Sequence, residues 1–410
     1  MTQAQLSLRR ERWLLITLAG IQFTHILDFM IMMPLGPQLT RLFGISDAQF
    51  GLLVSAYTLS AGLSGLVATT YVDRFGRKRL LLVLYTLFAL ATLACGLAPG
   101  YGFLMAARVA AGVFGGVLSA VSQTIVADVV PFERRGRAMG IVMSAFSVST
   151  VAGVPASLWL ANLSTWQAPF FGIALMSGLL AVAAGLSMPV LDQHLQTTRS
   201  GGVWRGIAQV LADPNHLRAF AFSALLMFTG FTVIPFITIY MQANVGLVDE
   251  QIPYVYLAGG AATLFTARLF GRMADHHGKV RTFTWLALAV TVPILATTLM
   301  PRVPLWVVLM VSTSLFVFLS GRMIPGMALV ASAADPARRG TFMVLNASVQ
   351  SVAMGAASLI GGLIIARDAA GQVQRYGWAG VIGCLASLGA IVLARRLTLH
   401  GAVDGPARQG

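Results

Sequence analysis

Residues 69–78 read Thr-Thr-Tyr-Val-Asp-Arg-Phe-Gly-Arg-Lys, a short polar loop between two long apolar runs. A related loop follows at residues 271–279, Gly-Arg-Met-Ala-Asp-His-His-Gly-Lys, and the two aspartates are 202 residues apart. Two further loops, which begin at Arg134 and Arg338, share an Arg-Arg-Gly triplet at an offset of 204 residues. Matching loops at nearly one offset indicate a duplicated structural unit.

The apolar runs between these loops are long enough to be membrane helices. The chain is 57% hydrophobic and only 10% charged, whereas a soluble domain has about 25% charged residues. A crossing helix needs ~20 apolar residues, and we predict an all-α integral membrane protein with 12 spans in two pseudo-symmetric six-helix bundles. The predicted spans are residues 13–40, 48–71, 79–98, 102–127, 137–162, 167–189, 217–243, 251–273, 280–300, 304–331, 341–366 and 376–394.

Basic residues are distributed unevenly between the two sides of this predicted bundle. The chain contains 28 Lys and Arg, of which 21 lie in segments on the side of the two termini, and its net charge is +14. The positive-inside rule then predicts a multi-pass protein of a bacterial-type inner membrane with both termini in the cytoplasm. The charge is thus a topology signal and predicts no nucleic-acid partner. The long first span predicts no cleavable signal peptide.

The most polar interior stretch divides the chain into two halves. We predict an N-terminal bundle at 1–190, a cytoplasmic linker at 191–216 with an amphipathic piece near Trp204–Leu211, and a C-terminal bundle at 217–410. Two parallel repeats around a midplane cavity are a transporter architecture. The two cysteines stand far apart in apolar segments, which predicts neither a disulfide nor a metal site.

Asp28 lies in the middle of the apolar run from Trp13 to Leu39, while the other 13 acidic residues fall at predicted helix ends, in loops or in the tails. A charge at bilayer depth costs from about 3 to more than about 10 kcal/mol, so such a residue faces a cavity or a partner. His25 lies on the same helical face. We predict that both exchange protons near neutral pH. The alternatives are a structural ion pair for Asp28 and a neutral, hydrogen-bonded imidazole for His25.

The repeated loops resemble the motif Gly-x-x-x-Asp-Arg/Lys-x-Gly-Arg-Arg/Lys of the major facilitator superfamily, and the resemblance covers nearly the whole chain. Thr69 replaces the leading glycine, which leaves the charged part of the motif intact. The matching residues are Asp73, Arg74, Gly76, Arg77 and Lys78 in the first copy and Gly271, Asp275, Gly278 and Lys279 in the second.

In that family the motif is a conformational latch. The resemblance implies that Asp73, Arg77 and Asp128 form a charge cluster that closes the cytoplasmic face and breaks for inward opening. A second interpretation is that the basic residues of this loop only set topology and bind anionic headgroups.

Span four is similar to the family's Arg-x-x-x-Gly signature, with Arg108 followed by Gly112. Gly112 and Gly116 form a small-xxx-small face for close helix packing. We predict that Arg108 is an intramembrane cation near Asp28 that tunes its protonation. The alternatives are a permanent Arg–Asp pair and an arginine that snorkels outward.

Span five contains Gly153-Val154-Pro155, which predicts a kink at a hinge or simply at a packing contact. Drug–proton antiporters of the superfamily have Gly-Pro-x-x-Gly-Gly here, and this chain has an inserted valine and lacks the double glycine. The Gly-Val-Pro form, followed by Trp166, resembles the sugar-efflux (arabinose-efflux-like) branch of the 12-span drug–proton antiporters.

Polar or adaptable side chains within the spans predict a substrate cavity. The candidates are Gln22, Met32, Tyr57, Gln123, Thr232, Tyr240, Asn346, Gln350 and Arg322. The alternative is that most of the polar side chains among them form hydrogen bonds between helices, since the sequence does not fix their directions. Arg322 is a second intramembrane cation, placed to meet an anionic substrate group or to close an inner gate.

We predict a secondary transporter that works by alternating access and exports a small molecule in exchange for protons. It needs no cofactor other than the proton gradient, is no enzyme, and works as a monomer in the lipid bilayer. No nucleotide-binding motif is present in the sequence. The alternatives are a proton symporter or uniporter that imports a metabolite and, more distantly, a non-transporting membrane sensor.

Overall fold

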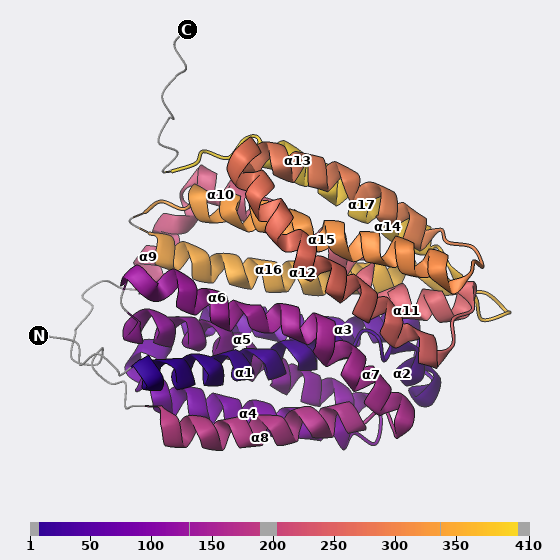
Figure 1. Ribbon diagram of the computed structural model, residues 1–410, viewed down its shortest axis with the longest axis horizontal. Helices are drawn as coiled ribbons and strands as arrows, with labels where there is room; N and C mark the ends of the chain where they lie inside the picture. The colour runs from indigo at the N-terminus through magenta and orange to yellow at the C-terminus, as the bar shows by residue number, and fades with distance from the viewer. Residues whose placement is uncertain (1–7, 131, 189–202, 337, 401–410) are drawn as a thin grey trace, which may run out of the picture.

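A computed structural model describes residues 8–130, 132–188, 203–336 and 338–400. Nearly all of them form helices, which lie in two bundles side by side (Figure 1). The indigo-to-magenta half of the chain forms one bundle and the pink-to-yellow half forms the other. Both described ends of the chain lie at the same end of the molecule, which we name the terminal end. The other end is named the distal end.

The first bundle consists of eight helices, two of which continue one another. They are α1 (Leu8–Ile31), α2 (Gly36–Phe43), α3 (Asp47–Ala68), α4 (Arg77–Gly96), α5 (Tyr101–Val129), α6 (Phe132–Val148), α7 (Val154–Leu163) and α8 (Ala168–Ser187). A 3-10 turn covers Val72–Arg74, and a π-helical turn over Ser149–Gly153 joins α6 to α7.

The second bundle repeats this pattern and adds a hairpin. Its elements are α9 (Val203–Leu211), α10 (Pro214–Phe231), α11 (Ile237–Tyr240), α12 (Ile252–His277), α13 (Lys279–Ala289), α14 (Thr291–Thr298), α15 (Leu305–Ala333), α16 (Arg339–Ile364), β1 (Ala366–Arg367), β2 (Val373–Gln374) and α17 (Tyr376–Ala394). Short 3-10 and π turns cover Ile234–Phe236, Met241–Val245 and Asp249–Gln251. The hairpin pairs Arg367 with Val373 in antiparallel register. Helix α9 covers the amphipathic piece expected near Trp204.

Eleven helical segments among the described residues are long and apolar enough to cross a membrane by length and composition. They coincide with the predicted spans except the eighth, which α12 covers. Helix α12 has 26 residues but is less apolar, since it contains Arg268, Arg272 and several glycines and tyrosines. Its length alone suffices to span a bilayer, and with α12 each bundle has six spans.

Prolines interrupt three of the predicted spans. The first predicted span ends earlier than expected, because the chain turns at Met32–Leu35, around Pro34, before α2 begins. In span seven Pro235 lies in the 3-10 turn between α10 and α11. In span five Pro155 follows the π-helical turn at the second position of α7. The predicted irregularity at Gly153 and Pro155 is therefore present, because proline cannot donate to the preceding turn of a helix.

Small residues bring helices close together within the first bundle and between the two bundles. A β-carbon at Gly112 would press on the Tyr57 carbonyl, and one at Gly116 on that of Ala61. The predicted close-packing face of span four is thus confirmed, and it packs on α3. Across the interface α3 packs on α16, where the Ser55 hydroxyl donates to the Gly355 carbonyl at 2.8 Å. Small residues permit such close approach of helices within a membrane.

The hydrophobic core is shared between the bundles mainly toward the distal end. The largest buried cluster lies there and contains residues of both bundles, such as Phe50 and Phe236, whose rings make an edge contact. The two clusters toward the terminal end are each drawn almost wholly from one bundle. The bundles are therefore joined more tightly at the distal end than at the terminal end.

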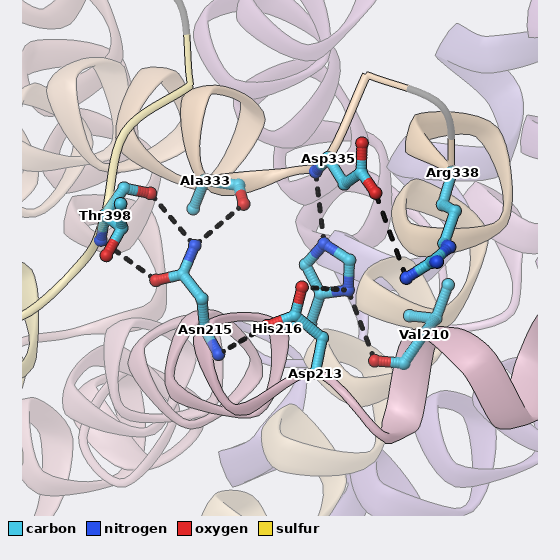
Figure 2. A network of polar contacts seen from close by, with 8 residues as sticks. All are labelled: Val210, Asp213, Asn215, His216, Ala333, Asp335, Arg338 and Thr398. Atoms are coloured by element: carbon cyan, nitrogen blue, oxygen red, sulfur yellow. Dashed lines mark hydrogen bonds and ion pairs between the residues drawn. The ribbon is translucent and has the colours of Figure 1, made fainter.

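A buried histidine organises the terminal end of the second bundle (Figure 2). His216, at the start of α10, accepts a hydrogen bond at Nε2 from the Asp335 backbone N–H, and its Nδ1 lies 3.2 Å from the Val210 carbonyl. Next to it, the Asn215 amide donates to the Ala333 and Thr398 carbonyls. These contacts tie α9, the α15–α16 loop and the segment after α17 to one helix end.

Candidate functional site

The predicted proton-coupling pair lies inside the first bundle. Arg108 on α5 and Asp28 on α1 have side chains that are 0% exposed, and Arg108 Nη1 lies 2.8 Å from Asp28 Oδ2. The same nitrogen also donates to the Asp28 carbonyl at 3.2 Å. Arg108 therefore neutralises Asp28 and bonds its helix. An ion pair without solvent is far more sensitive to the loss of one charge than a surface pair.

Aromatic rings connect this pair to the second bundle. The Arg108 guanidinium carbon lies 4.4 Å from the centre of the Tyr57 ring, a cation–π distance. Phe29, one residue after Asp28, stacks on Tyr57 with ring centres 5.4 Å apart. On its other side Phe29 stacks on Phe231 of α10 at 5.9 Å. The charged pair is thus within two rings of the opposite bundle.

Several polar atoms of this cluster have no hydrogen-bond partner among the described residues. They include both ring nitrogens of His25, the Tyr57 hydroxyl, Asp28 Oδ1, and Arg108 Nε and Nη2. His25 lies beside Tyr57, with ring centres 6.1 Å apart. Buried polar groups are normally paired, so a group of unpaired ones marks a place where water, a proton or a substrate group can bind. We name His25, Asp28, Tyr57 and Arg108 the central cluster.

The other predicted cavity residues of the first bundle are Gln22, Met32 and Gln123. Gln22 donates to the Ser119 hydroxyl at 3.0 Å, a bond between α1 and α5. Met32 is completely buried in the hydrophobic cluster shared by the two bundles. Gln123 is exposed on α5, toward the terminal end.

In the second bundle the predicted cavity residues are spread over its length. Tyr240 bonds the Met300 carbonyl at 2.9 Å, toward the distal end. Thr232 is buried and lies 3.4 Å from the Thr229 carbonyl within its own helix. Asn346 is buried with its Oδ1 unpaired among the described residues, and Gln350, one turn away, contacts the Met327 sulfur at 3.4 Å.

The two copies of the loop motif lie at the terminal end, and both use a lysine in the same way. Lys78 Nζ donates at 2.6 Å to the Met188 carbonyl, just after α8. Lys279 Nζ donates at 3.1 Å to the hydroxyl of Ser332 in the last turn of α15. A cation at a helix C-terminus is favourable for the helix dipole.

The remaining motif residues divide between the buried and the exposed. In the first copy Arg77 is buried and bonds the Val72 carbonyl at 3.3 Å, Gly76 precedes α4, and Arg74 is exposed. The side chains of Asp73 and Asp128, needed for the latch hypothesis, lie outside the described residues. In the second copy Gly271 lies within α12, Asp275 is exposed, and Gly278 ends α12 with φ 84°.

Two ion pairs join the bundles at the distal end, and the sequence reasoning missed both. Asp47, at the start of α3, accepts two hydrogen bonds of 2.8 Å from Arg367 of the hairpin. Arg41, on α2, lies 3.4 Å from Asp249 of the second bundle. The Asn162 amide also donates to the Asp249 carbonyl, at 2.9 Å. An open pocket of about 480 Å³ is lined by Arg41, Asp249 and Arg367.

The hairpin that carries Arg367 is held by its neighbour Asp368. Its carboxylate accepts bonds from the Gln372 and Ala370 backbone N–H groups and from the Gln374 amide. The Gln372 backbone N–H is the main reason that the pKa of Asp368 lies below its usual value. No local sequence signal pairs Asp47 with Arg367, since 320 residues separate them.

A duplicated bundle of membrane helices with charged groups buried at its centre defines a membrane transporter. The chain belongs to the major facilitator superfamily, because the profile described as Major Facilitator Superfamily matches residues 18–232 and again 219–408. The two matches cover nearly the whole chain and agree with the duplicated unit indicated by the loops.

Curated relatives match different shares of the chain. It is 25% identical over 353 residues to the uncharacterized MFS-type transporter YtbD of Bacillus subtilis (strain 168), which is 84% of each chain. It is 30% identical over 171 residues to YhcA of the same organism, which is 42% of this chain but only 32% of that protein. It is 23% identical over 282 residues to Multidrug resistance protein 2 of that organism, covering 67% of this chain and 70% of that one.

Solved transporters have the same fold. A bacterial homologue of the human lysosomal transporter Spinster, in an inward-facing and occupied conformation, superimposes with a TM-score of 0.76 at 16% identity, covering 96% of this chain and 98% of that one. The D-xylose–proton symporter gives a TM-score of 0.76 at 17% identity, covering 94% and 97%.

Proposed function

We propose that this protein exports a small molecule across a bacterial-type inner membrane in exchange for protons. The observation that supports this most is the fully buried Asp28–Arg108 pair, 2.8 Å long and surrounded by unpaired polar atoms of His25 and Tyr57. Similarity to Multidrug resistance protein 2 supports the export direction. The chain works as a monomer with no cofactor.

The terminal end faces the cytoplasm in this proposal. Its loops contain Arg134 and Arg338, and the topology predicted from the sequence assigns 21 of the 28 Lys and Arg to this side. Lysines and arginines are retained on the cytoplasmic side during insertion. The distal end, with the hairpin and the Asp47–Arg367 pair, then faces outward.

The structure then corresponds to a state closed toward the outside. The two bundles share a core, two ion pairs and the Asn162 bond at the distal end. Toward the terminal end their cores are largely separate. Alternating access requires these distal contacts to break when the outside opens, while the terminal end closes. The predicted latch of Asp73, Arg77 and Asp128 belongs to that second closure, and the irregular helix at Gly153 and Pro155 provides a hinge.

Proton binding at Asp28 changes the charge of the central cluster from zero to plus one. An ionised Asp28 neutralises the positive charge of Arg108. A protonated Asp28 no longer does so, and the arginine cannot become neutral itself, because arginine retains its proton in proteins. An uncompensated charge in a dry site is costly, so the arginine must find other partners. The neighbouring Tyr57 ring links that rearrangement through Phe29 to Phe231 of the second bundle. Protonation from outside thereby favours substrate release and the return of the empty site.

Transport by purified protein in liposomes tests this function. The panel contains one cationic, one neutral and one anionic amphipathic solute: ethidium, chloramphenicol and 1-naphthoate. We expect uptake of at least one against its gradient when the lumen is acidic, and only equilibration without a pH gradient. Asp28→Asn should abolish the uphill phase and retain solute-for-solute exchange.

The matched control is Glu250→Gln, which removes an exposed carboxylate at the distal end. It should retain uphill transport. Full uphill transport by Asp28→Asn would show that the Asp28 carboxylate has a structural role and does not couple protons to transport. Transport that depends on a gradient of the opposite sign would instead identify a proton symporter.

A further inference from the structure

Arg322 is a buried cation in the second bundle that the proposed proton coupling does not use. It lies on α15 and its side chain is 1% exposed. Its Nη2 donates to the Leu226 carbonyl of α10 at 2.8 Å. Its Nε and Nη1 have no hydrogen-bond partner among the described residues.

The bond to Leu226 does not neutralise this charge. Leu226 lies within α10, so its carbonyl already accepts the helical N–H of Gly230. That carbonyl offers a partial charge only, whereas a guanidinium remains protonated even when it is buried. A charge in such a place normally has an ionic partner.

The second bundle contains no carboxylate that could be this partner at span depth. In residues 203–400 the acidic side chains are Asp213, Asp249, Glu250, Asp275, Asp335 and Asp368, and all lie at helix ends or in loops. In the first bundle Asp28 is already paired with Arg108. Among the described residues, Arg322 is therefore a buried charge with no counter-ion.

The repeat shows that the fold does not need a cation at this junction. At the offset of 204 residues Leu226 corresponds to Gln22 and Arg322 to Leu118, the neighbour of Ser119. There the same two helices of the first bundle are joined by a neutral hydrogen bond of 3.0 Å between Gln22 and Ser119. A neutral contact thus suffices to pack the pair of helices.

We propose that Arg322 binds the negatively charged group of the substrate and that the substrate is an amphipathic organic monoanion. This inference rests on the proposed transport function and adds the substrate class to it. The two unpaired nitrogens supply charge-assisted hydrogen bonds to a carboxylate or an equivalent acid group. Phe270 packs against Gly321, and Leu226 and Phe283 pack against Gly326, so the surroundings suit an apolar body.

The direction of transport is consistent with this charge. A bacterial cytoplasm is electrically negative, and the membrane potential therefore drives an anion outward. Exchange of one proton inward for one monoanion outward moves two charges in the same sense. Both the pH gradient and the potential then favour export.

Binding to purified protein in detergent tests the proposal without any gradient. The probes are matched pairs of a carboxylate and its amide: 1-naphthoate with 1-naphthamide, 4-phenylbutyrate with 4-phenylbutyramide, and decanoate with decanamide. Thermal unfolding midpoints give the apparent affinities. We expect at least one carboxylate to bind about ten-fold or more tightly than its amide, and Arg322→Gln to remove that preference. Arg302→Gln, at an exposed loop arginine, is the control and should retain it.

The unliganded variants supply a second readout. Arg322→Met should unfold at a higher temperature than the wild type, because it replaces an uncompensated buried charge by an apolar side chain of similar length. A lower midpoint for both Arg322→Met and Arg322→Gln would make the arginine structural and overturn the proposal.

The proposal is also overturned if the amides bind as tightly as the carboxylates, if Arg322→Gln retains the preference, or if no carboxylate of the panel binds. These outcomes differ from failure of the proposed function. If carboxylates bind through Arg322 but transport is independent of the pH gradient, proton coupling is contradicted and the anion site is still supported. Uphill transport of ethidium that is unchanged by Arg322→Gln would support proton coupling and contradict the anion site.

Discussion

At the scale of single residues, this chain places charge inside an apolar core at two points that differ in kind. Asp28 and Arg108 form a neutral pair with bonds of 2.8 and 3.2 Å between their helices. Arg322 is bonded only to a backbone carbonyl among the described residues. In our account one proton switches the Asp28–Arg108 pair, and one anion completes the contacts of Arg322.

The Asp28–Arg108 pair makes an ordered prediction about stability. Arg108→Gln leaves a carboxylate that can take up a proton and become neutral. Asp28→Asn leaves a guanidinium that cannot become neutral. We expect Asp28→Asn to lower the free energy of unfolding by about 3 kcal/mol and Arg108→Gln by clearly less. The double variant should recover most of the loss of Asp28→Asn.

Denaturant unfolding in detergent, monitored by tryptophan fluorescence, measures these differences. Losses that simply add in the double variant would show that the two side chains do not interact as a buried pair. Equal losses for the two single variants would contradict the predicted order, in which the carboxylate left by Arg108→Gln can become neutral.

The proximity of Asp28 and Arg108 could be predicted from the sequence because Asp28 is the one acidic residue placed in the middle of an apolar run. The directions of Tyr240 and Gln22 could not be, because a polar side chain in a membrane helix can bond a neighbouring helix as well as a cavity. Tyr240 bonds the Met300 carbonyl, and Gln22 bonds Ser119.

At the scale of elements, length and hydropathy located the membrane helices, whereas proline set where they break. Spans five and seven each consist of two helical pieces joined through a π or 3-10 turn. The distal contacts of the hairpin lay outside sequence reasoning, because β1 and β2 have two residues each and Arg367 pairs with a residue 320 positions away.

The Asp47–Arg367 pair should contribute to closure of the distal end. The arginine side chain is 37% exposed, so solvent screens the bond and a contribution of about 1 kcal/mol is expected despite its bidentate geometry. Removing it with Arg367→Gln should raise the population open at the distal end about five-fold. Spin labels at the exposed positions Leu42 and Val248, one on each bundle, report that opening as a longer distance.

Arg302→Gln, which removes an exposed arginine of the same end, should leave the distance distribution unchanged. An unchanged distribution in Arg367→Gln as well would show that the shared hydrophobic core alone keeps the distal end closed.

At the scale of the whole molecule, the repeat explains both what was predictable and what was not. Two pairs of matching loops, offset by 202 and 204 residues, predicted two similar bundles, and the family profile matches the chain twice. The end at which the bundles are joined could not be predicted. It depends on contacts such as Phe50 with Phe236 and Asp47 with Arg367, which a sequence pattern does not encode.

The repeat also shows where the bundles differ, and function is expected at those differences. The first bundle contains an acid–base pair and the second an unpaired cation. In our account one bundle carries the proton and the other the substrate's charge, so that alternating access exchanges the two.

The most direct test of that account is the movement of protons caused by substrate. The purified protein is placed in liposomes that contain a pH-sensitive dye and have no initial pH gradient. Valinomycin and potassium clamp the membrane potential. An outward or inward gradient of 1-naphthoate is then applied. Our account predicts that naphthoate moving in one direction drives protons in the other, and that Asp28→Asn abolishes this proton flux while exchange of labelled naphthoate continues. A proton flux that persists in Asp28→Asn, or naphthoate transport by the wild type without any proton flux, would contradict it.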